Sequence, residues 1–297
     1  MQFLFSPHNA FSTLLSSLRK VDILEPAQVF ELFFTSEIMD ILVKHTNTYT
    51  NIKNANSGDK AWKLPGRIWK NVSKSELKRW IGILIYMGVF GSCATRDYWR
   101  KSTLYPTHPI SEYMSQTRFE QILRYFHISD PSVVPENNRN TAWTYKVEPL
   151  LETVHQASSK YYTPGTEVSI DEAMIRFCGR SRDTFKMPNK PIDEGYKAFC
   201  LADRGYIFDF RMASRSRPTP GVERVDNLSN TSAMVFSLAM SLPYKHKAFT
   251  IYMDNYFSNV PLFLKLRKFG IGACGTAKQN CSGFPKDLKV RKTLTGN

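Results

Sequence analysis

Two aspartates stand where apolar strands are expected to end, and they are the residues with the clearest chemical potential. Asp171 follows the segment EVSI (167–170), and Asp254 follows AFTIYM (248–253). Carboxylate oxygens are the ligands that Mg²⁺ prefers, and Mn²⁺ shares this preference. Metal ions held by both aspartates would activate water or a 3′-hydroxyl for attack on a phosphodiester. The alternative is that each aspartate only caps a turn, which is a common role at strand ends.

A basic segment follows the first aspartate directly. Residues 176–191, RFCGRSRDTFKMPNKP, contain five basic residues and one acid. We predict a hairpin here whose basic side chains hold DNA phosphates near the carboxylates, with Gly179 allowing close approach of the backbone. The predicted DNA-binding residues are Arg176, Arg180, Arg182, Lys186 and Lys190. The alternative is a solvated basic loop without a ligand.

The elements expected around the aspartates define a fold. Alternating and apolar runs predict strands near 167–171, 196–202 and 206–212, and again at 248–254 and 271–276. Helices are expected at 230–242 and 259–269. Three strands in a meander, followed by helix-connected strands, predict a mixed sheet covered by helices, in the order of a ribonuclease H-like fold. In this topology the strands that precede Asp171 and Asp254 are neighbours, so the two carboxylates are expected to converge.

The sequence before this region is mainly helical. Helices are expected at 25–47, 73–90 and 115–129, and the second opens with Ser73 and Glu76 as a capping box. We therefore predict an α+β protein with a mixed sheet. Its parts would be an N-terminal tail (1–24), a mainly helical domain (25–165) and a partial ribonuclease H-like catalytic domain (166–297).

Composition favours a polyanionic partner. The 297 residues carry a net charge of +14, and residues 255–297 hold eight Lys or Arg against one acid. Such an excess favours nucleic acid first and an acidic membrane surface second; a merely soluble basic protein is the remaining alternative.

Five scattered cysteines without a CxxC pair indicate a reducing compartment, and dispersed histidines disfavour a His/Cys metal site. No apolar run is long enough for a membrane helix, and we expect no signal peptide.

Several separated motifs resemble the piggyBac transposase family. They are FELFFTSEIMDILVKHTN, SIDEAMIRFCGRS, MPNKP with GYK shortly after, and MDNYFSNVPLFLKLRKFGIGACGT, in collinear order over about residues 25–285. The resemblance implies that Asp171 and Asp254 are the first and second catalytic, metal-binding aspartates, with Mg²⁺ or Mn²⁺ as cofactor. It also implies a helical region for DNA binding and homodimerisation, transposon ends and TTAA-type target DNA as partners, joining of 3′ ends, and a nuclear location.

The sequence also departs from the family pattern. The third aspartate of the family is expected beyond Asn297, Asp287 fits no family motif, and Cys178 stands where Arg or Lys is expected. We therefore expect a truncated, catalytically incomplete chain that binds metal weakly and does not transpose alone. The alternative from another class is a domesticated DNA-binding or transposase-regulating protein without catalysis. A third possibility is an unstable product without a role.

Overall fold

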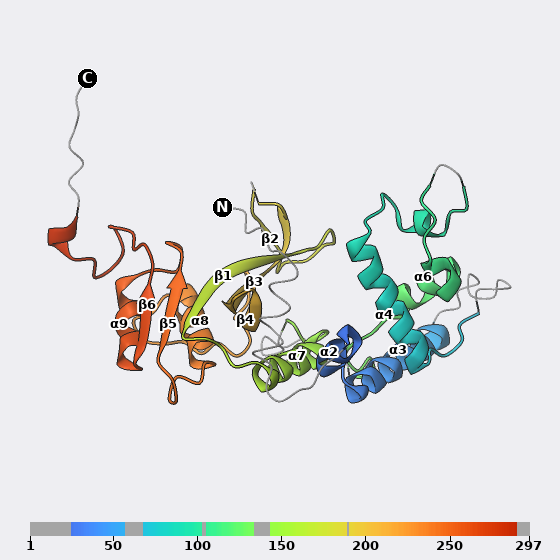
Figure 1. Ribbon diagram of the computed structural model, residues 1–297, viewed down its shortest axis with the longest axis horizontal. Helices are drawn as coiled ribbons and strands as arrows, with labels where there is room; N and C mark the ends of the chain where they lie inside the picture. Colours follow the sequence, from blue (N-terminus) through green and yellow to red (C-terminus); the bar gives the residue numbers. More distant parts are fainter. Residues whose placement is uncertain (1–24, 57–67, 103–104, 134–142, 189, 290–297) are drawn as a thin grey trace, which may run out of the picture. The chain divides into compact units, whose positions relative to one another are not determined.

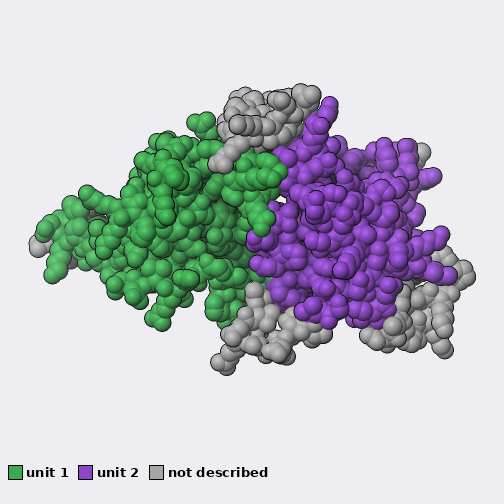
Figure 2. All heavy atoms as spheres, turned by 90° about the horizontal axis from the view of Figure 1, so that it is seen from below, with its two compact units in different colours: residues 1–24, 142–144, 155–297 green, residues 25–141, 145–154 purple. Residues whose placement is uncertain are grey.

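The computed structural model describes residues 25–56, 68–102, 105–133, 143–188 and 190–289. The predicted N-terminal tail (1–24) lies outside these residues. The chain divides into two compact units, coloured separately in Figure 2: residues 25–141 with 145–154, and residues 142–144 with 155–297. Among the described helices, none combines the length and apolar character needed to cross a membrane.

The first unit is helical, as expected. It contains α2 (Pro26–Phe33), α3 (Ser36–Asn56), α4 (Lys74–Val89), α5 (Ile110–Tyr113), α6 (Gln116–Tyr125) and a 3₁₀ turn η2 (Thr95–Trp99). The single helix predicted at 25–47 is wrong, because the helix ends at Phe33 and a new one begins at Ser36. Thr35 Oγ1 accepts a hydrogen bond from the Ile38 N–H at 3.4 Å, which caps the new helix.

The core of the helical unit joins helices that are distant in sequence. Met39 and Leu42 of α3, Leu77 of α4 and Ile122 of α6 are all fully buried. Ser73 caps α4 by accepting the Glu76 N–H at 3.2 Å. The Glu76 carboxylate also accepts two hydrogen bonds from Arg118, of 2.7 and 2.8 Å, and a backbone hydrogen bond from Ser73 contributes to lowering its pKa.

The second unit contains a mixed six-stranded sheet. Its strands are β1 (Glu167–Arg176), β2 (Phe185–Lys186), β3 (Glu194–Asp203), β4 (Tyr206–Ala213), β5 (Phe249–Met253) and β6 (Ile271–Cys274). The spatial order is β2-β3-β1-β5-β6, with β4 also paired to β3. Strands β1, β3 and β4 are antiparallel, whereas β1, β5 and β6 are parallel. The predicted meander and the predicted parallel neighbours are both confirmed (Figure 1).

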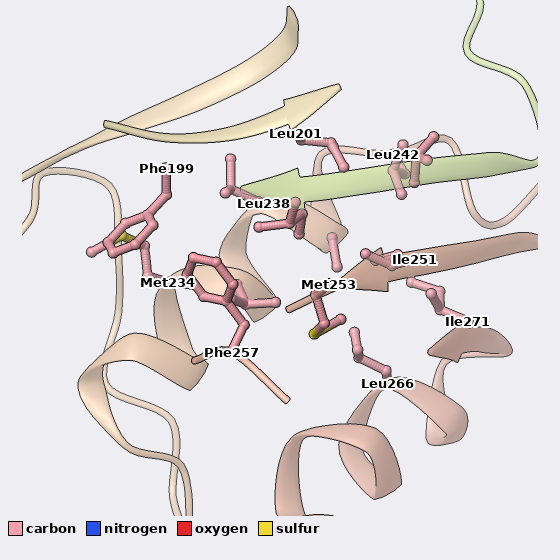
Figure 3. Packing of buried hydrophobic residues seen from close by; sticks show 14 of the residues in the cluster. Phe199, Leu201, Met234, Leu238, Leu242, Ile251, Met253, Phe257, Leu266 and Ile271 are labelled. Atoms are coloured by element: carbon pink, nitrogen blue, oxygen red, sulfur yellow. The ribbon is translucent and has the colours of Figure 1, made fainter. Parts of the chain in front are cut away.

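Two helices connect the parallel strands and bury one face of the sheet. Helix α8 (Asn230–Met240) precedes β5, and α9 (Val260–Lys268) connects β5 to β6. Leu238 of α8 and Leu266 of α9 are completely buried in the same apolar cluster as Ile251 of β5 (Figure 3). Val235 of α8 belongs to this cluster as well. This packing fixes β5 beside β1, and therefore sets where the residue after β5 lies.

The connection between β3 and β4 is a tight hairpin turn. Arg204 and Gly205 both have positive φ angles, 49° and 87°. Two central residues with positive φ are the mark of a type I′ turn, whose twist matches that of the flanking strands. A short turn of this kind sets the register in which β4 follows β3.

Several helical elements were not predicted: η2, α5, the 3₁₀ turn η3 (Lys286–Leu288) and the helix that precedes the sheet. One strand is longer than predicted. Helix α7 (Glu148–Tyr161) precedes the sheet, and the division between the two units passes through it, between Val154 and His155. The predicted domain boundary lies after this helix, between residues 165 and 166. Strand β1 does not end at Asp171 as predicted but continues to Arg176, because β3 keeps pairing with it as far as Gly195.

Candidate functional site

Asp171 and Asp254 lie side by side at the end of a parallel strand pair. Ile170 of β1 is opposite Met253 of β5, and this is the last pair in the parallel ladder. The two aspartates are the next residue of each strand path. Neighbouring strands are about 4.8 Å apart. Ile170 and Met253 are buried in the core, whereas both aspartates are exposed, as alternation across a strand requires.

The electrostatics of Asp171 reflect this proximity. Burial raises the pKa of Asp171, and the charges of Glu172 and Asp254 raise it further. The Glu172 N–H donates to Asp171 Oδ1 at 2.7 Å, which opposes the rise without cancelling it. The charge of Asp254 therefore reaches Asp171, although 82 residues separate them in the chain. Clustered like charges of this kind are relieved by protonation or by a cation.

Asp254 is held by the turn that follows β5. Its Oδ1 accepts the Tyr256 N–H at 2.8 Å, and its carbonyl accepts the Ser258 Oγ at 2.7 Å. A Cβ at Gly275 would collide with Ser258 Oγ and the Met253 carbonyl, so only glycine lets the chain after β6 pack here. The turn-capping role raised as an alternative is thus present, and it also fixes the position of the carboxylate.

The two carboxylates fit part of a divalent-metal site. They supply adjacent oxygen donors at an exposed position, and burial together with the charges of Glu172 and Asp254 raises the pKa of Asp171. In the part of the chain that the structure describes, no three His, Cys, Asp or Glu side chains form a group able to hold a metal ion. Cys200 lies opposite Asp171 on β3, but burial and the neighbouring carboxylates raise its thiol pKa to about 11, so no thiolate contributes at neutral pH.

Some of the predicted DNA-binding residues have an ion-pair partner within the protein and others do not. Arg180 and Arg182 are exposed and have no ion-pair partner among the described residues. Lys186 lies 3.7 Å from Glu194 and Lys190 lies 3.2 Å from Glu172, so each already has a carboxylate partner. The Lys190–Glu172 pair brings the far end of the basic segment next to Asp171.

The predicted hairpin across 176–191 has a different form. Arg176 belongs to β1 rather than to a loop, and its guanidinium donates to the Pro191 carbonyl at 3.4 Å. The return strand is the short β2, which pairs with β3 at Gly195 and not with β1. Gly195 of β3 is therefore paired with Arg176 of β1 on one side and with Phe185 of β2 on the other.

A charged cluster beyond the prediction surrounds Asp183. This aspartate is 3% exposed and accepts hydrogen bonds from Ser214 Oγ at 2.6 Å and from the Arg217 guanidinium. Burial opposes its ionisation, but the hydrogen bonds and charge of Arg217 outweigh burial and lower the pKa of Asp183. Asp183 is thereby a structural anchor that ties the basic segment to the loop after β4.

A buried lysine was also missed. Lys197 on β3 is only 5% exposed and lines a cavity of about 620 Å³. The signal was a lysine inside the apolar strand GYKAFCLA, a position where a charge is rarely fully buried without a partner.

The mixed sheet with its covering helices is the fold predicted for a transposase, and comparison with known proteins shows that the chain is related to transposases. The family model described as Transposase IS4 matches residues 25–297, so the chain belongs to this transposase family. It is a transposase-derived protein of the piggyBac type, as the motifs predicted.

Two human relatives and one solved structure are similar to the chain. PiggyBac transposable element-derived protein 2 of Homo sapiens is 28% identical over 279 residues, covering 91% of this chain and 43% of the relative. PiggyBac transposable element-derived protein 3 of Homo sapiens is 25% identical over 276 residues, covering 93% and 42%. The chain therefore spans less than half the length of these relatives.

The structural match confirms the fold class. A cryo-EM structure of a piggyBac transposase synaptic complex with hairpin DNA superposes with a TM-score of 0.77 at 24% identity, over 93% of this chain and 56% of that one. The predicted combination of helices with a mixed, ribonuclease H-like sheet is the fold of that transposase.

Proposed function

We propose that this chain binds DNA through its sheet unit and that Asp171 and Asp254 are two carboxylate ligands of a divalent metal ion. The observation that carries the proposal is their adjacency at the end of the β1–β5 ladder, with the pKa of Asp171 raised by burial and by neighbouring carboxylates. A divalent ion bound there would polarise a phosphodiester and activate water or a 3′-hydroxyl. Mg²⁺ and Mn²⁺ are the ions we expect.

The side chains around the pair have separate tasks in this proposal. Asp171 and Asp254 hold the ion, and the turn bond from the Tyr256 N–H fixes the orientation of Asp254. Arg180 and Arg182 are exposed and free to bind backbone phosphates. Because the described residues bring only two aspartates together, we propose that they do not complete a catalytic site alone. Transposon ends, TTAA-type targets, a homodimer and a nuclear location belong to the same proposal.

Metal binding is tested separately from catalysis. Mn²⁺ should raise the melting temperature of the protein, and Asp171→Asn or Asp254→Asn should abolish the rise. Asp226→Asn is the matched control, because Asp226 is an exposed aspartate of the same unit outside the site. An equal Mn²⁺ effect in all four proteins would refute the site. Metal-dependent nicking of DNA that depends on both aspartates would add residual catalysis to the proposal.

A second candidate is DNA binding without catalysis, in a domesticated or transposase-regulating protein. The observation that favours it is the structural use of Asp254, whose Oδ1 already caps the turn. In that case DNA binding needs no divalent metal, persists in Asp171→Asn and weakens steeply with salt as counterions are released. Undetectable DNA affinity at low salt would refute both candidates.

A further inference from the structure

Lys197 is a buried cation without a counter-charge. It forms neither a hydrogen bond nor an ion pair with any residue that the structure describes, although it is 5% exposed. Instead its Nζ lies over three aromatic rings, 4.7 Å from the centroid of Tyr256, 5.0 Å from Phe199 and 6.0 Å from Phe185. Aromatic faces stabilise a cation, but they do not replace the hydrogen-bond acceptors that an ammonium group loses on burial.

An acidic residue on the neighbouring strand, Glu172, does not pair with this lysine. Glu172 is opposite Phe199 in the β1–β3 ladder, and so lies diagonal to Lys197 on the same face of the sheet. Its Oε1 binds Lys190 at 3.2 Å, whereas its buried Oε2 has no hydrogen-bond partner in the described part of the chain. The protein therefore leaves the Lys197 ammonium available to a ligand in the cavity.

The cavity lining is strongly basic. Besides Lys197, it contains Arg215, Arg217 and Arg224, and among its described lining residues Glu223 is the one acid. Arg217 is committed to Asp183, whereas Arg215 and Arg224 are exposed and have no ion-pair partner among the residues described. The guanidinium groups of Arg215 and Arg224 at the rim and the buried ammonium group of Lys197 together form a suitable environment for an oxyanion.

A helix N-terminus faces the same cavity. Asn230 and Thr231, the first two residues of α8, line it, and the first turn of α8 contains no acidic residue. Ser229 caps the Ser232 N–H, so the N–H groups of Asn230 and Thr231 are not used by this cap. The partial positive charge of a helix N-terminus attracts phosphate groups. Here it acts together with the buried lysine.

We infer that the Lys197 cavity binds the phosphate group of a nucleotide within the DNA strand, at a position separate from the carboxylate pair. The phosphate would lie between Lys197 and the start of α8, with Arg215 and Arg224 closing over it. A cavity of about 620 Å³ is much larger than a phosphate ion needs, and its aromatic wall suits a sugar or base. The identity of the strand as DNA rests on the function proposed above, whereas the oxyanion site does not.

The turn after β5 links this cavity to the carboxylates. Tyr256 forms part of the aromatic wall, and its N–H donates to Asp254 Oδ1 at 2.8 Å. A nucleotide seated against Tyr256 is therefore positioned by the same turn that orients Asp254. The cavity would thus set which phosphodiester of the strand comes to the carboxylate pair.

The first experiment uses inorganic phosphate as the probe, at constant ionic strength. Phosphate should raise the melting temperature of the wild type, and Lys197→Met should weaken phosphate affinity roughly tenfold or more, since charged hydrogen bonds are lost. Lys247→Met is the matched control: Lys247 is a half-buried lysine over Phe249 and lies outside the cavity. Because Lys197→Met could disturb folding, Arg224→Gln at the exposed rim gives a second test, with a smaller loss expected.

The second experiment identifies the source of the phosphate. If DNA supplies it, inorganic phosphate competes with a fluorescent DNA oligonucleotide, and Lys197→Met weakens DNA binding more than Lys247→Met does. If phosphate binds in a Lys197-dependent way without affecting DNA binding, the site takes a free phosphate compound and the DNA assignment is wrong. Equal phosphate stabilisation in wild type, Lys197→Met and Arg224→Gln overturns the whole inference. Loss of metal binding or nicking alone leaves it intact.

Discussion

Two aspartates of the sheet unit, Asp171 and Asp183, have pKa values shifted in opposite directions. Asp183 is more deeply buried, yet its pKa is lowered because Arg217 and Ser214 bind its carboxylate. Asp171 is more exposed, yet its partial burial and the charges of Glu172 and Asp254 raise its pKa, and no cation pairs with its carboxylate among the described residues. The comparison separates a carboxylate that is paired with an arginine from one that has no cationic partner among the described residues.

The helical unit contains a carboxylate that is paired with an arginine in the same way as Asp183. Glu76 is bound by both Arg118 Nε and Nη2, and these hydrogen bonds lower the pKa of its carboxyl group. Lys197 resembles Asp171 only in lacking a partner of opposite charge among the described residues.

Removing Arg217 should give the largest loss of stability. Arg217→Met leaves the Asp183 carboxylate buried without its cation, and we expect the free energy of unfolding to fall by about 3 kcal/mol. Asp183→Asn should cost less, about 2 kcal/mol, because Arg217 is half exposed and turns to solvent. Urea unfolding measures both. A double variant as unstable as the sum of the two single variants would show that the pair is not coupled.

The Asp183–Arg217 pair should also make the stability of the protein depend on pH in the acid range. The folded-state pKa of Asp183 lies below its ordinary value of 3.8, so its ionisation stabilises the fold above that pH. This stabilisation is lost as the pH falls through the lowered pKa. Urea midpoints measured from pH 6 downward should therefore decline less steeply for Asp183→Asn than for the wild type. If the urea midpoints of the wild type and Asp183→Asn declined equally with pH, the ionised Asp183 carboxylate would not stabilise the fold.

Asp171 should behave in the opposite way. Its raised pKa means that the folded state binds the proton more tightly than the unfolded state, so stability declines as the pH rises from 3.8 through the raised pKa. In EDTA at neutral pH, Asp171→Asn should leave stability unchanged or raise it by less than about 1 kcal/mol, since the site is solvent-accessible. A clear loss of stability in urea would show that Asp171 is structural, like Asp183.

The smallest effect concerns an exposed cation of the basic segment. Arg182→Gln should change stability by less than about 0.5 kcal/mol. It should reduce the slope of log affinity for DNA against log salt concentration by about one, because one phosphate contact is lost. Lys245→Gln, at an exposed lysine outside the segment, is the control. The same change of slope in both variants would show that the basic segment contributes only to the overall positive charge and makes no specific phosphate contact.

Local patterns predicted most elements of the sheet unit and their order. The alternation in EVSI, the apolar runs before Asp254 and the helix at 230–242 all correspond to elements of the structure. They did so because periodicity and apolar content depend on residues close in the chain. The end of β1 was misplaced because its last residues are stabilised by β3, a partner that local patterns do not specify. Helix α7 was likewise not predicted.

The sequence by itself predicted two carboxylates that could act, Asp171 and Asp254, and a basic segment after the first; the lysine within GYKAFCLA was present in the sequence but was not singled out. The sequence also predicted, through strand order, that Asp171 and Asp254 would be neighbours. Only the tertiary structure decided which charges are balanced. Lys190 meets Glu172, Arg217 meets Asp183 and Lys197 meets only rings, and these outcomes depend on register and loop paths across distant segments. Electrostatic energy depends on distance in space, and the linear sequence does not contain that distance.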